Sequence, residues 1–278
     1  MNAPTNMNAL LPENAKALLP DIQSRNDDRH LCIDAVGIKG LRYPVTVRSG
    51  DKEMATVASL SMTVGLSAAR KGTHMSRFIE VLEASTAPLD QAGFQALLTA
   101  MLDKLHASSG EIAMCFPWFV KKSAPVSGVQ SLLDYEVCWR ARRSPAGRLE
   151  FAMKVTVPVT SLCPCSKEIS DYGAHNQRSL ISIDAEIAGA MAIEELIAIA
   201  ERSASCQVYG LLKRPDEKYV TEHAYDNPKF VEDLVRDVAL ALNGERRVAA
   251  YTVEAENFES IHNHSAYARI ERRPDSPH

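Results

Sequence analysis

The sequence has no long apolar run and no excess of positive charge. A membrane-spanning helix needs about 20 consecutive apolar residues, and no segment of the 278-residue chain approaches that length. The N-terminus lacks the charged and then apolar order of a signal peptide. The net charge of −4 gives no electrostatic footprint for nucleic acid or an anionic membrane. We therefore expect neither a membrane nor a nucleic acid as a partner.

Cysteines are few, and the common nucleotide-binding motifs are missing. The six cysteines are scattered along the chain, at positions 32, 115, 138, 163, 165 and 206, without the density of a disulfide-stabilised scaffold. We interpret them as reduced thiols in a cytoplasmic protein. No P-loop, GxGxxG fingerprint or serine-nucleophile elbow is present, so nucleotide binding through the folds that carry those motifs has no support.

Hydrophobic periodicity predicts two successive groups of elements with the same order, strand–strand–helix–helix–strand–strand. The first group comprises strands over 36–48 and 58–66, helices over 76–83 and 89–106, and strands over 112–120 and 132–142. The second comprises strands over 149–157 and 180–187, helices over 192–201 and from near Asn227 to Gly244, and strands over 248–255 and 265–270.

This repeated order predicts an α+β protein with antiparallel sheets, each covered on one face by a helix pair. Residues 1–30 mix proline, asparagine and charge, and we predict a flexible arm there. Residues 31–147 and 148–273 are the two predicted units. The free sheet faces need a cover, which closure of several sheets into a multimeric barrel would provide.

The segment 161–179, SLCPCSKEISDYGAHNQRS, is the strongest candidate for chemistry. Thiolate and imidazole are ligands for borderline-soft divalent metals, and Cys163 and His175 are a loop apart. Cys163 and Cys165 are too close in sequence for the usual zinc knuckle, so we expect one functional thiol and one neighbour. Lys167 favours a thiolate. A buried structural thiol and a solvated loop histidine are the alternatives.

The segment 256–264 contains two carboxylates and two imidazoles. Glu259 and His262 would face one metal if the loop formed a helical turn, and a solvated polar loop is the alternative. Glu217 lies in a charged segment, 213–218, which we predict to be a surface loop. Glu232 lies on the flank of its helix, where the pattern alone indicates no role.

Basic side chains precede the first helix pair. Near a helix N-terminus they suit a phosphate group, although they also occur on solvated faces. They are Lys71, His74 and Arg77.

Five strings of the sequence together identify a family. They are GIKGLRYP (37–44), KGTHMSRF (71–78), SLCPCSKEISDYGAHNQRS (161–179), PKFVEDLVRD (228–237) and ENFESIHNHSAYA (256–268). In this order they resemble GTP cyclohydrolase of type IB, and DIQSRNDDR (21–29) fits as well. The resemblance covers nearly the whole chain after residue 20.

The resemblance implies a tunnelling fold (T-fold), in which units of this element order assemble into barrels. It implies two units per chain, a homotetramer, and active sites between subunits. It also implies the conversion of GTP and water to formate and 7,8-dihydroneopterin triphosphate, the first step of tetrahydrofolate biosynthesis.

The resemblance further implies roles for individual residues. Cys163 falls on the catalytic metal-site thiol, and Glu232 on the anchor of the guanine base. The other metal-site positions are His175, Glu217, Glu259 and His262. Such a mixed donor set suits Zn²⁺, Mn²⁺ or Fe²⁺, whose bound water would attack guanine C8 while a group such as His175 shuttles protons. The basic residues expected at the triphosphate are Lys71, His74, Arg77 and Lys167.

Two other functions compete with this one. In a nitrile reductase of the same fold, the cysteine would attack the substrate and NADPH would reduce it. In a non-enzymatic reading, the cysteine and histidine residues would form a structural zinc site. The carboxylates and histidines of 256–264 favour metal-dependent hydrolysis over the reductase.

Overall fold

The computed structural model describes residues 20–273 and contains one continuous antiparallel sheet. Its strand order is β1-β2-β3-β4-β5-β6-β8-β9, with the short β7 paired to β5. The strands are β1 (Ile33–Ser49), β2 (Lys52–Leu66), β3 (Gly110–Ser123), β4 (Gln130–Arg143), β5 (Leu149–Leu162), β6 (Asn176–Ile187), β7 (Cys206–Gln207), β8 (Val248–Asn257) and β9 (Ala266–Arg272). The β4–β5 pairing joins the predicted units 31–147 and 148–273 into one sheet.

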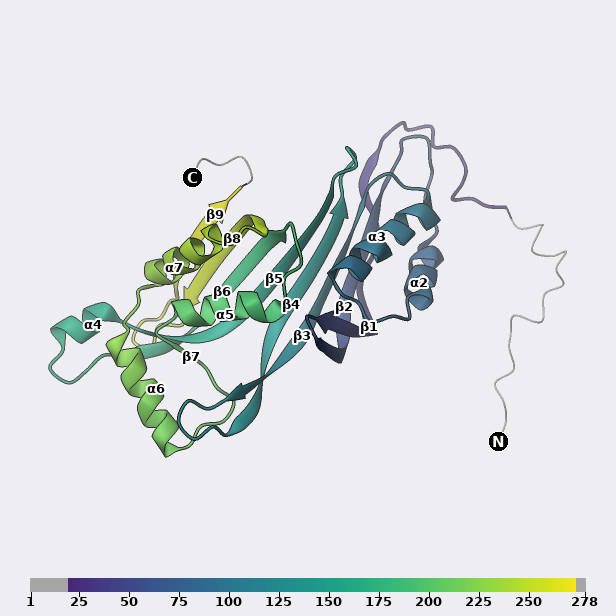
Figure 1. Ribbon diagram of the computed structural model, residues 1–278. Helices are drawn as coiled ribbons and strands as arrows, with labels where there is room; N and C mark the ends of the chain where they lie inside the picture. Colours follow the sequence, from purple (N-terminus) through teal and green to yellow (C-terminus); the bar gives the residue numbers. More distant parts are fainter. Residues whose placement is uncertain (1–19, 274–278) are drawn as a thin grey trace, which may run out of the picture.

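The helices lie against the sheet in two groups (Figure 1). Helices α2 (Met75–Ala84) and α3 (Gln91–Leu105) pack over the first strands, and α5 (Ile193–Ser203) and α7 (Val231–Asn243) pack over the second group. Helices α4 (Pro164–Ile169) and α6 (Arg214–Asp226) lie at the opposite end of the molecule from α2. None of the helices within 20–273 has the length and hydropathy needed to cross a bilayer.

The core forms where the alternating strands meet the apolar stripes of the helices. Leu60 and Met62 of β2 and Leu98 of α3 are fully buried, as the alternating and helical patterns predict. Between the two helix groups, Phe94 of α3 packs edge-on against Trp139 of β4, with ring centroids 5.8 Å apart. The predicted α+β class with antiparallel pairing is thus confirmed.

Two sequence-based assignments near the C-terminal half are wrong. The predicted surface loop 213–218 contains the first turn of α6, which the pattern missed because only Asp216 and Ala224 of this helix are buried. A helix with so few apolar contacts has no hydrophobic period to detect. The last helix begins at Val231 rather than near Asn227, and residues 227–230 form a connection.

The prediction that all six cysteines are reduced thiols is wrong for one pair. Cys115 of β3 and Cys138 of β4 lie directly opposite each other in the strand register and form a disulfide. Strand pairing brings the two together across 23 residues of sequence, a proximity that cysteine spacing alone does not show. Cys32, Cys163, Cys165 and Cys206 are free thiols.

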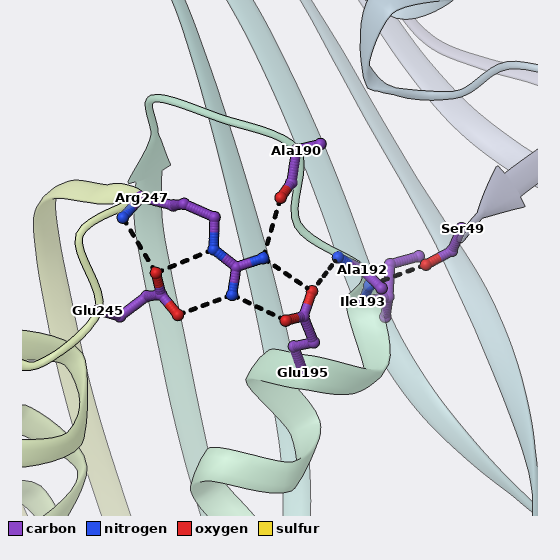
Figure 2. Close-up of polar contacts among 7 residues, drawn as sticks. All are labelled: Ser49, Ala190, Ala192, Ile193, Glu195, Glu245 and Arg247. Atoms are coloured by element: carbon purple, nitrogen blue, oxygen red, sulfur yellow. Dashed lines mark hydrogen bonds and ion pairs between the residues drawn. The ribbon is translucent and has the colours of Figure 1, made fainter.

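Polar contacts hold the first turn of α5 in place (Figure 2). The N-cap residue Ala192 has no side-chain acceptor, and the hydroxyl of Ser49, at the end of β1, accepts from the Ile193 N–H at 2.8 Å. On the other side, Arg247 donates to Glu195 at 2.8 Å and to Glu245 at 2.7 Å. Hydrogen bonds from Arg247 lower the pKa of Glu245 to about 2. The first unit thus caps a helix of the second.

Replacement of Ser49 should therefore weaken the contact between the units. We expect Ser49→Ala to lower the free energy of unfolding by about 1 kcal/mol, the usual cost of losing a helix N-cap. Urea unfolding followed by circular dichroism measures this difference. Ser59→Ala, at an exposed position of β2, is the matched control and should leave stability unchanged. Equal stability of the two variants would contradict the capping role.

Candidate functional site

Cys163 lies at the junction of β5 and α4. It is the N-cap residue of α4, with Pro164 in the first turn, and its Sγ accepts from the Ser166 N–H at 3.4 Å. The side chain is half-buried, whereas that of Cys165 is exposed. The structure therefore places the two thiols in different surroundings, and only Cys163 is held against the end of the sheet.

His175 lies beside Cys163 because β5 and β6 pair up to their ends. The Cys163 N–H donates to the His175 carbonyl at 3.1 Å. The His175 N–H in turn donates to the Ser166 hydroxyl at 3.2 Å, and this hydroxyl donates to the Cys163 carbonyl at 3.1 Å. The loop 163–175 is thus closed by hydrogen bonds that bring together the backbones of the residues that carry the predicted thiol and imidazole ligands.

The loop between β8 and β9 reaches the same place. Ser260 Oγ lies 3.3 Å from His175 Nδ1, and the Phe258 N–H donates to the Arg178 carbonyl at 3.0 Å. The helical turn considered for this loop does not form, because residues 260–264 are a series of bends. Glu259 and His262 nevertheless meet, with 3.6 Å between Oε2 and Nδ1.

Glu232 is placed near these segments by the connection before α7. The Lys229 N–H donates to the Leu162 carbonyl at 3.0 Å, which holds the start of α7 to the end of β5. Glu232 lies in the first turn of α7 with an exposed side chain. Its helix thus begins close to the residue that precedes Cys163, a placement that the helical pattern alone did not indicate.

Other predicted residues are not brought to this place within one chain. Glu217 is exposed on the first turn of α6, whereas α4 contacts the other end of α6 through the hydrogen bond of Lys167 Nζ to the Tyr225 carbonyl. Lys71, His74 and Arg77 precede or begin α2, which lies far from α4 in Figure 1.

Part of the predicted N-terminal arm contacts this basic segment. The Lys71 N–H donates to the Arg25 carbonyl at 3.0 Å, and His74 Nε2 lies 3.3 Å from Asp21 Oδ2. Residues 1–19 of the predicted arm lie outside the described residues. The contacts place the basic segment against residues 21–25 of the same chain.

The side chains present fit a divalent metal by donor type but do not form a complete site in one chain. Thiol and imidazole come from Cys163 and His175, and carboxylate and imidazole from Glu259 and His262, all of which are usual ligands. Within residues 20–273, no three His, Cys, Asp or Glu side chains are grouped closely enough to hold a metal ion. One chain thus presents two pairs of donors.

Comparison with known proteins gives one consistent family. The family model described as type I GTP cyclohydrolase folE2 matches residues 19–268. A GTP cyclohydrolase FolE2 of Paraburkholderia xenovorans (strain LB400) is 60% identical over 261 residues, which cover 93% of this chain and 97% of that protein. A GTP cyclohydrolase FolE2 of Herminiimonas arsenicoxydans is 61% identical over 254 residues, covering 91% and 97%.

The solved structures that match are far more distant in sequence. Uricase from Arthrobacter globiformis aligns with a TM-score of 0.53 and 8% identity, over 88% of this chain and 96% of that chain. At this identity the match shows the fold alone. The predicted T-fold architecture is confirmed.

Asp216, which our reading of the sequence missed, anchors the helix that carries Glu217. Its side chain is fully buried. It accepts from the N–H groups of Val126 and Ser127 at 2.8 Å each, from the Ser127 hydroxyl at 2.6 Å and from the Lys213 N–H at 2.8 Å. A carboxylate three residues after the residue that precedes a helix is a recognisable N-terminal signal.

These hydrogen bonds also determine the ionisation of Asp216. Desolvation acts to raise the pKa of this carboxyl, but the hydrogen bonds from Ser127, Lys213 and Val126 outweigh it and hold the pKa well below its ordinary value. A carboxyl whose pKa is lowered by folding stabilises the fold at pH values above its unfolded pKa, about 3.9 for Asp. This stabilisation disappears as the pH falls further.

We therefore expect Asp216→Asn to lower the free energy of unfolding at pH 7. The difference from wild type should shrink progressively below about pH 4, where the ionised carboxyl contributes less to the stability of the wild-type protein. Urea unfolding of both proteins at several pH values measures the difference. Glu222→Gln, on the exposed face of the same helix, is the control and should show little change. A pH-independent effect of Asp216→Asn would contradict the ionic role of Asp216.

Proposed function

The chain belongs to the type I GTP cyclohydrolase FolE2 family, and we propose on this premise that it converts GTP and water to formate and 7,8-dihydroneopterin triphosphate. This reaction is the first step of tetrahydrofolate biosynthesis. The observation that carries the proposal to this chain's own residues is the closure of the loop 163–175, in which the Cys163 N–H donates to the His175 carbonyl at 3.1 Å. It joins the backbones of a predicted thiol ligand and a predicted imidazole ligand at one end of the sheet.

The proposed metal is Zn²⁺, Mn²⁺ or Fe²⁺. The residues that would hold it are Cys163, His175, Glu217, Glu259 and His262. A divalent metal in such a site lowers the pKa of a bound water and supplies hydroxide near neutral pH. Because one chain presents four of these donors as two separate pairs and Glu217 apart from both, we infer that a second copy completes the set. This supports a homo-oligomer, for which we propose a tetramer with active sites between subunits.

The side chains of this chain perform the remaining work. Glu232 would accept two N–H bonds from the edge of guanine, which adenine cannot offer, and so select the base. His175 would carry a proton toward the ring nitrogen as the imidazole ring of guanine opens.

The triphosphate requires positive charge. Lys and Arg side chains bind phosphate oxygens through charge-assisted hydrogen bonds. We propose that Lys167 of α4, whose Nζ donates to the Tyr225 carbonyl near the end of α6, supplies one. The remaining proposed contacts lie at the start of α2, which a second chain would bring to the site, and they are Lys71, His74 and Arg77.

The reductase of the same fold is not favoured as an alternative. The family model and the relatives reported above are all cyclohydrolases. A reductase also needs no carboxylate–imidazole pair, whereas Glu259 and His262 form one in the loop whose Ser260 contacts His175.

Cys163 and Cys165 provide a matched pair of variants. We expect Cys163→Ala to lower dihydroneopterin triphosphate formation by more than about 100-fold. A loss of about 100-fold is the upper end of what is seen when a residue that only hydrogen-bonds to a metal ligand is changed. Cys165→Ala should stay close to the wild-type rate. Pterin fluorescence measures turnover, and circular dichroism checks that both variants are folded. Near-normal turnover of Cys163→Ala would refute the assignment of this thiol.

Removal of the metal separates a catalytic from a structural role. We expect a chelator to stop turnover while the thermal unfolding midpoint stays nearly unchanged, and add-back of Zn²⁺, Mn²⁺ or Fe²⁺ to restore turnover. A structural zinc site predicts instead that the chelator melts the fold. Undiminished turnover in protein shown by metal analysis to be metal-free would refute the proposed metal dependence.

A further inference from the structure

Four buried polar side chains extend from the candidate site into the core. They are Ser161, Gln177, Ser179 and Asn257, with exposed fractions of 0%, 7%, 0% and 3%. They come from three adjacent strands, because the register pairs Ser161 of β5 with Gln177 of β6, and Ser179 of β6 with Asn257 of β8.

These polar residues continue rows that are otherwise apolar. Two positions earlier or later on the same strands, Val159, Ile181 and Ala255 are fully buried. Apolar side chains would fill such positions without any need for hydrogen-bond partners, whereas buried polar groups are costly unless every one is paired. Along these three strands, the core-facing side chains therefore change from apolar to polar only at the end of the sheet that carries Cys163 and His175.

The four residues form a chain of hydrogen bonds in which each donor lies on the Gln177 side and each acceptor on the Asn257 side. Ser179 donates its hydroxyl hydrogen to Asn257 Oδ1 at 2.7 Å. Ser161, whose hydroxyl lies 2.6 Å from that of Ser179, then donates to Ser179. Ser161 in turn accepts from Gln177 Nε2 at 3.2 Å. Because each hydroxyl has a single hydrogen, this order leaves Gln177 with its carbonyl oxygen toward His175.

The last bond of this network determines which nitrogen of His175 carries the hydrogen. Gln177 Oε1 lies 3.0 Å from His175 Nδ1, and a carbonyl oxygen can only accept. The neutral imidazole must therefore carry its hydrogen on Nδ1, which leaves the lone pair of Nε2 free. Ser260 Oγ, 3.3 Å from the same Nδ1, is compatible as a second acceptor.

We propose that Gln177 is a positioning residue, which fixes the Nδ1–H tautomer of His175 and so presents Nε2 to the metal. This inference rests on the proposed metal site, and it adds a residue of the segment 161–179 to which the sequence analysis gave no role. A metal-binding histidine commonly donates its second N–H to a protein acceptor, which sets both its tautomer and its ring orientation. Here the acceptor is an amide whose own orientation is set by Ser161, Ser179 and Asn257.

The same network links His175 to the second pair of predicted ligands. Asn257 is the last residue of β8, directly before the segment that carries Glu259 and His262. Fixing Asn257 against Ser179 thus holds the start of that loop while Gln177 holds His175. One continuous set of buried hydrogen bonds therefore runs from His175 to the residue two positions before Glu259.

Nitrogen-15 NMR of the histidine side chains in metal-free protein tests the inference directly. We expect His175 to show Nδ1–H and unprotonated Nε2. Gln177→Met keeps the side-chain length but removes the acceptor, so this preference should be lost. Gln177→Glu keeps an acceptor oxygen and should restore it. Titration of Zn²⁺ against a competing chelator should show roughly 10–100-fold weaker binding by Gln177→Met, with recovery in Gln177→Glu.

Thr156→Val is the matched control. Thr156 pairs with Ser182 through a hydroxyl contact of 3.2 Å between the same two strands, outside the network. It should change neither the tautomer nor the zinc affinity. If Gln177→Met does not fold, Ser179→Ala, which breaks the network two residues away, replaces it and should shift both measurements in the same direction.

Three results would overturn the inference. The first is an unchanged Nδ1–H tautomer when Gln177 or Ser179 is replaced. The second is unchanged zinc affinity in those variants while His175→Ala binds zinc weakly, which would leave the proposed metal site intact and refute only the role of Gln177. Unchanged zinc affinity in His175→Ala would instead refute the metal role of His175, and the inference with it.

Discussion

The pairing of β5 with β6 is the constraint on which the candidate site depends. The ladder runs without a register shift to Leu162 and Asn176, so the residues just beyond its end, Cys163 and His175, are held beside each other. Any loop of this composition could contain a thiol and an imidazole. Only the pairing of the strands up to the loop brings the backbones of these two residues together, with the Ser166 hydroxyl closing the turn between them.

The first unit of the chain also shapes the second. The long β3–β4 hairpin reaches α5 and the segment that follows it, where Lys122 Nζ bonds to Glu201 at 2.6 Å and to the Val208 carbonyl at 2.8 Å. Its tip supplies the donors for Asp216. Gly210 allows this close packing, because a Cβ at that position would lie 2.5 Å from the Leu132 carbonyl oxygen. The helix that carries Glu217 therefore owes its position to residues about 90 positions earlier in the chain.

Stability and function place different demands on the end of the sheet. Farther along the same strands, at Val159, Ile181 and Ala255, the core-facing side chains are apolar, and their packing needs no directional contacts. Around the candidate site, polar groups replace apolar ones, and each must find a partner. A hydrogen-bond network of this kind contributes less packing than a row of apolar side chains, but it holds side chains in defined orientations. That is the property which a metal ligand or a proton carrier requires.

The sequence by itself determined much of this protein. Alternation and helical spacing predicted most strands and helices, because burial of one face leaves a period in the sequence. The strings around Cys163 and Glu259 identified the family, because the residues that characterise each string stand close together in the sequence. Tertiary structure alone decided the rest. Helix α6 has too few buried apolar side chains to leave a hydrophobic period in the sequence. The Cys115–Cys138 contact depends on strand register. Gln177 gains its role from partners on other strands, and the spacing of residues along the sequence does not show that these partners lie close together.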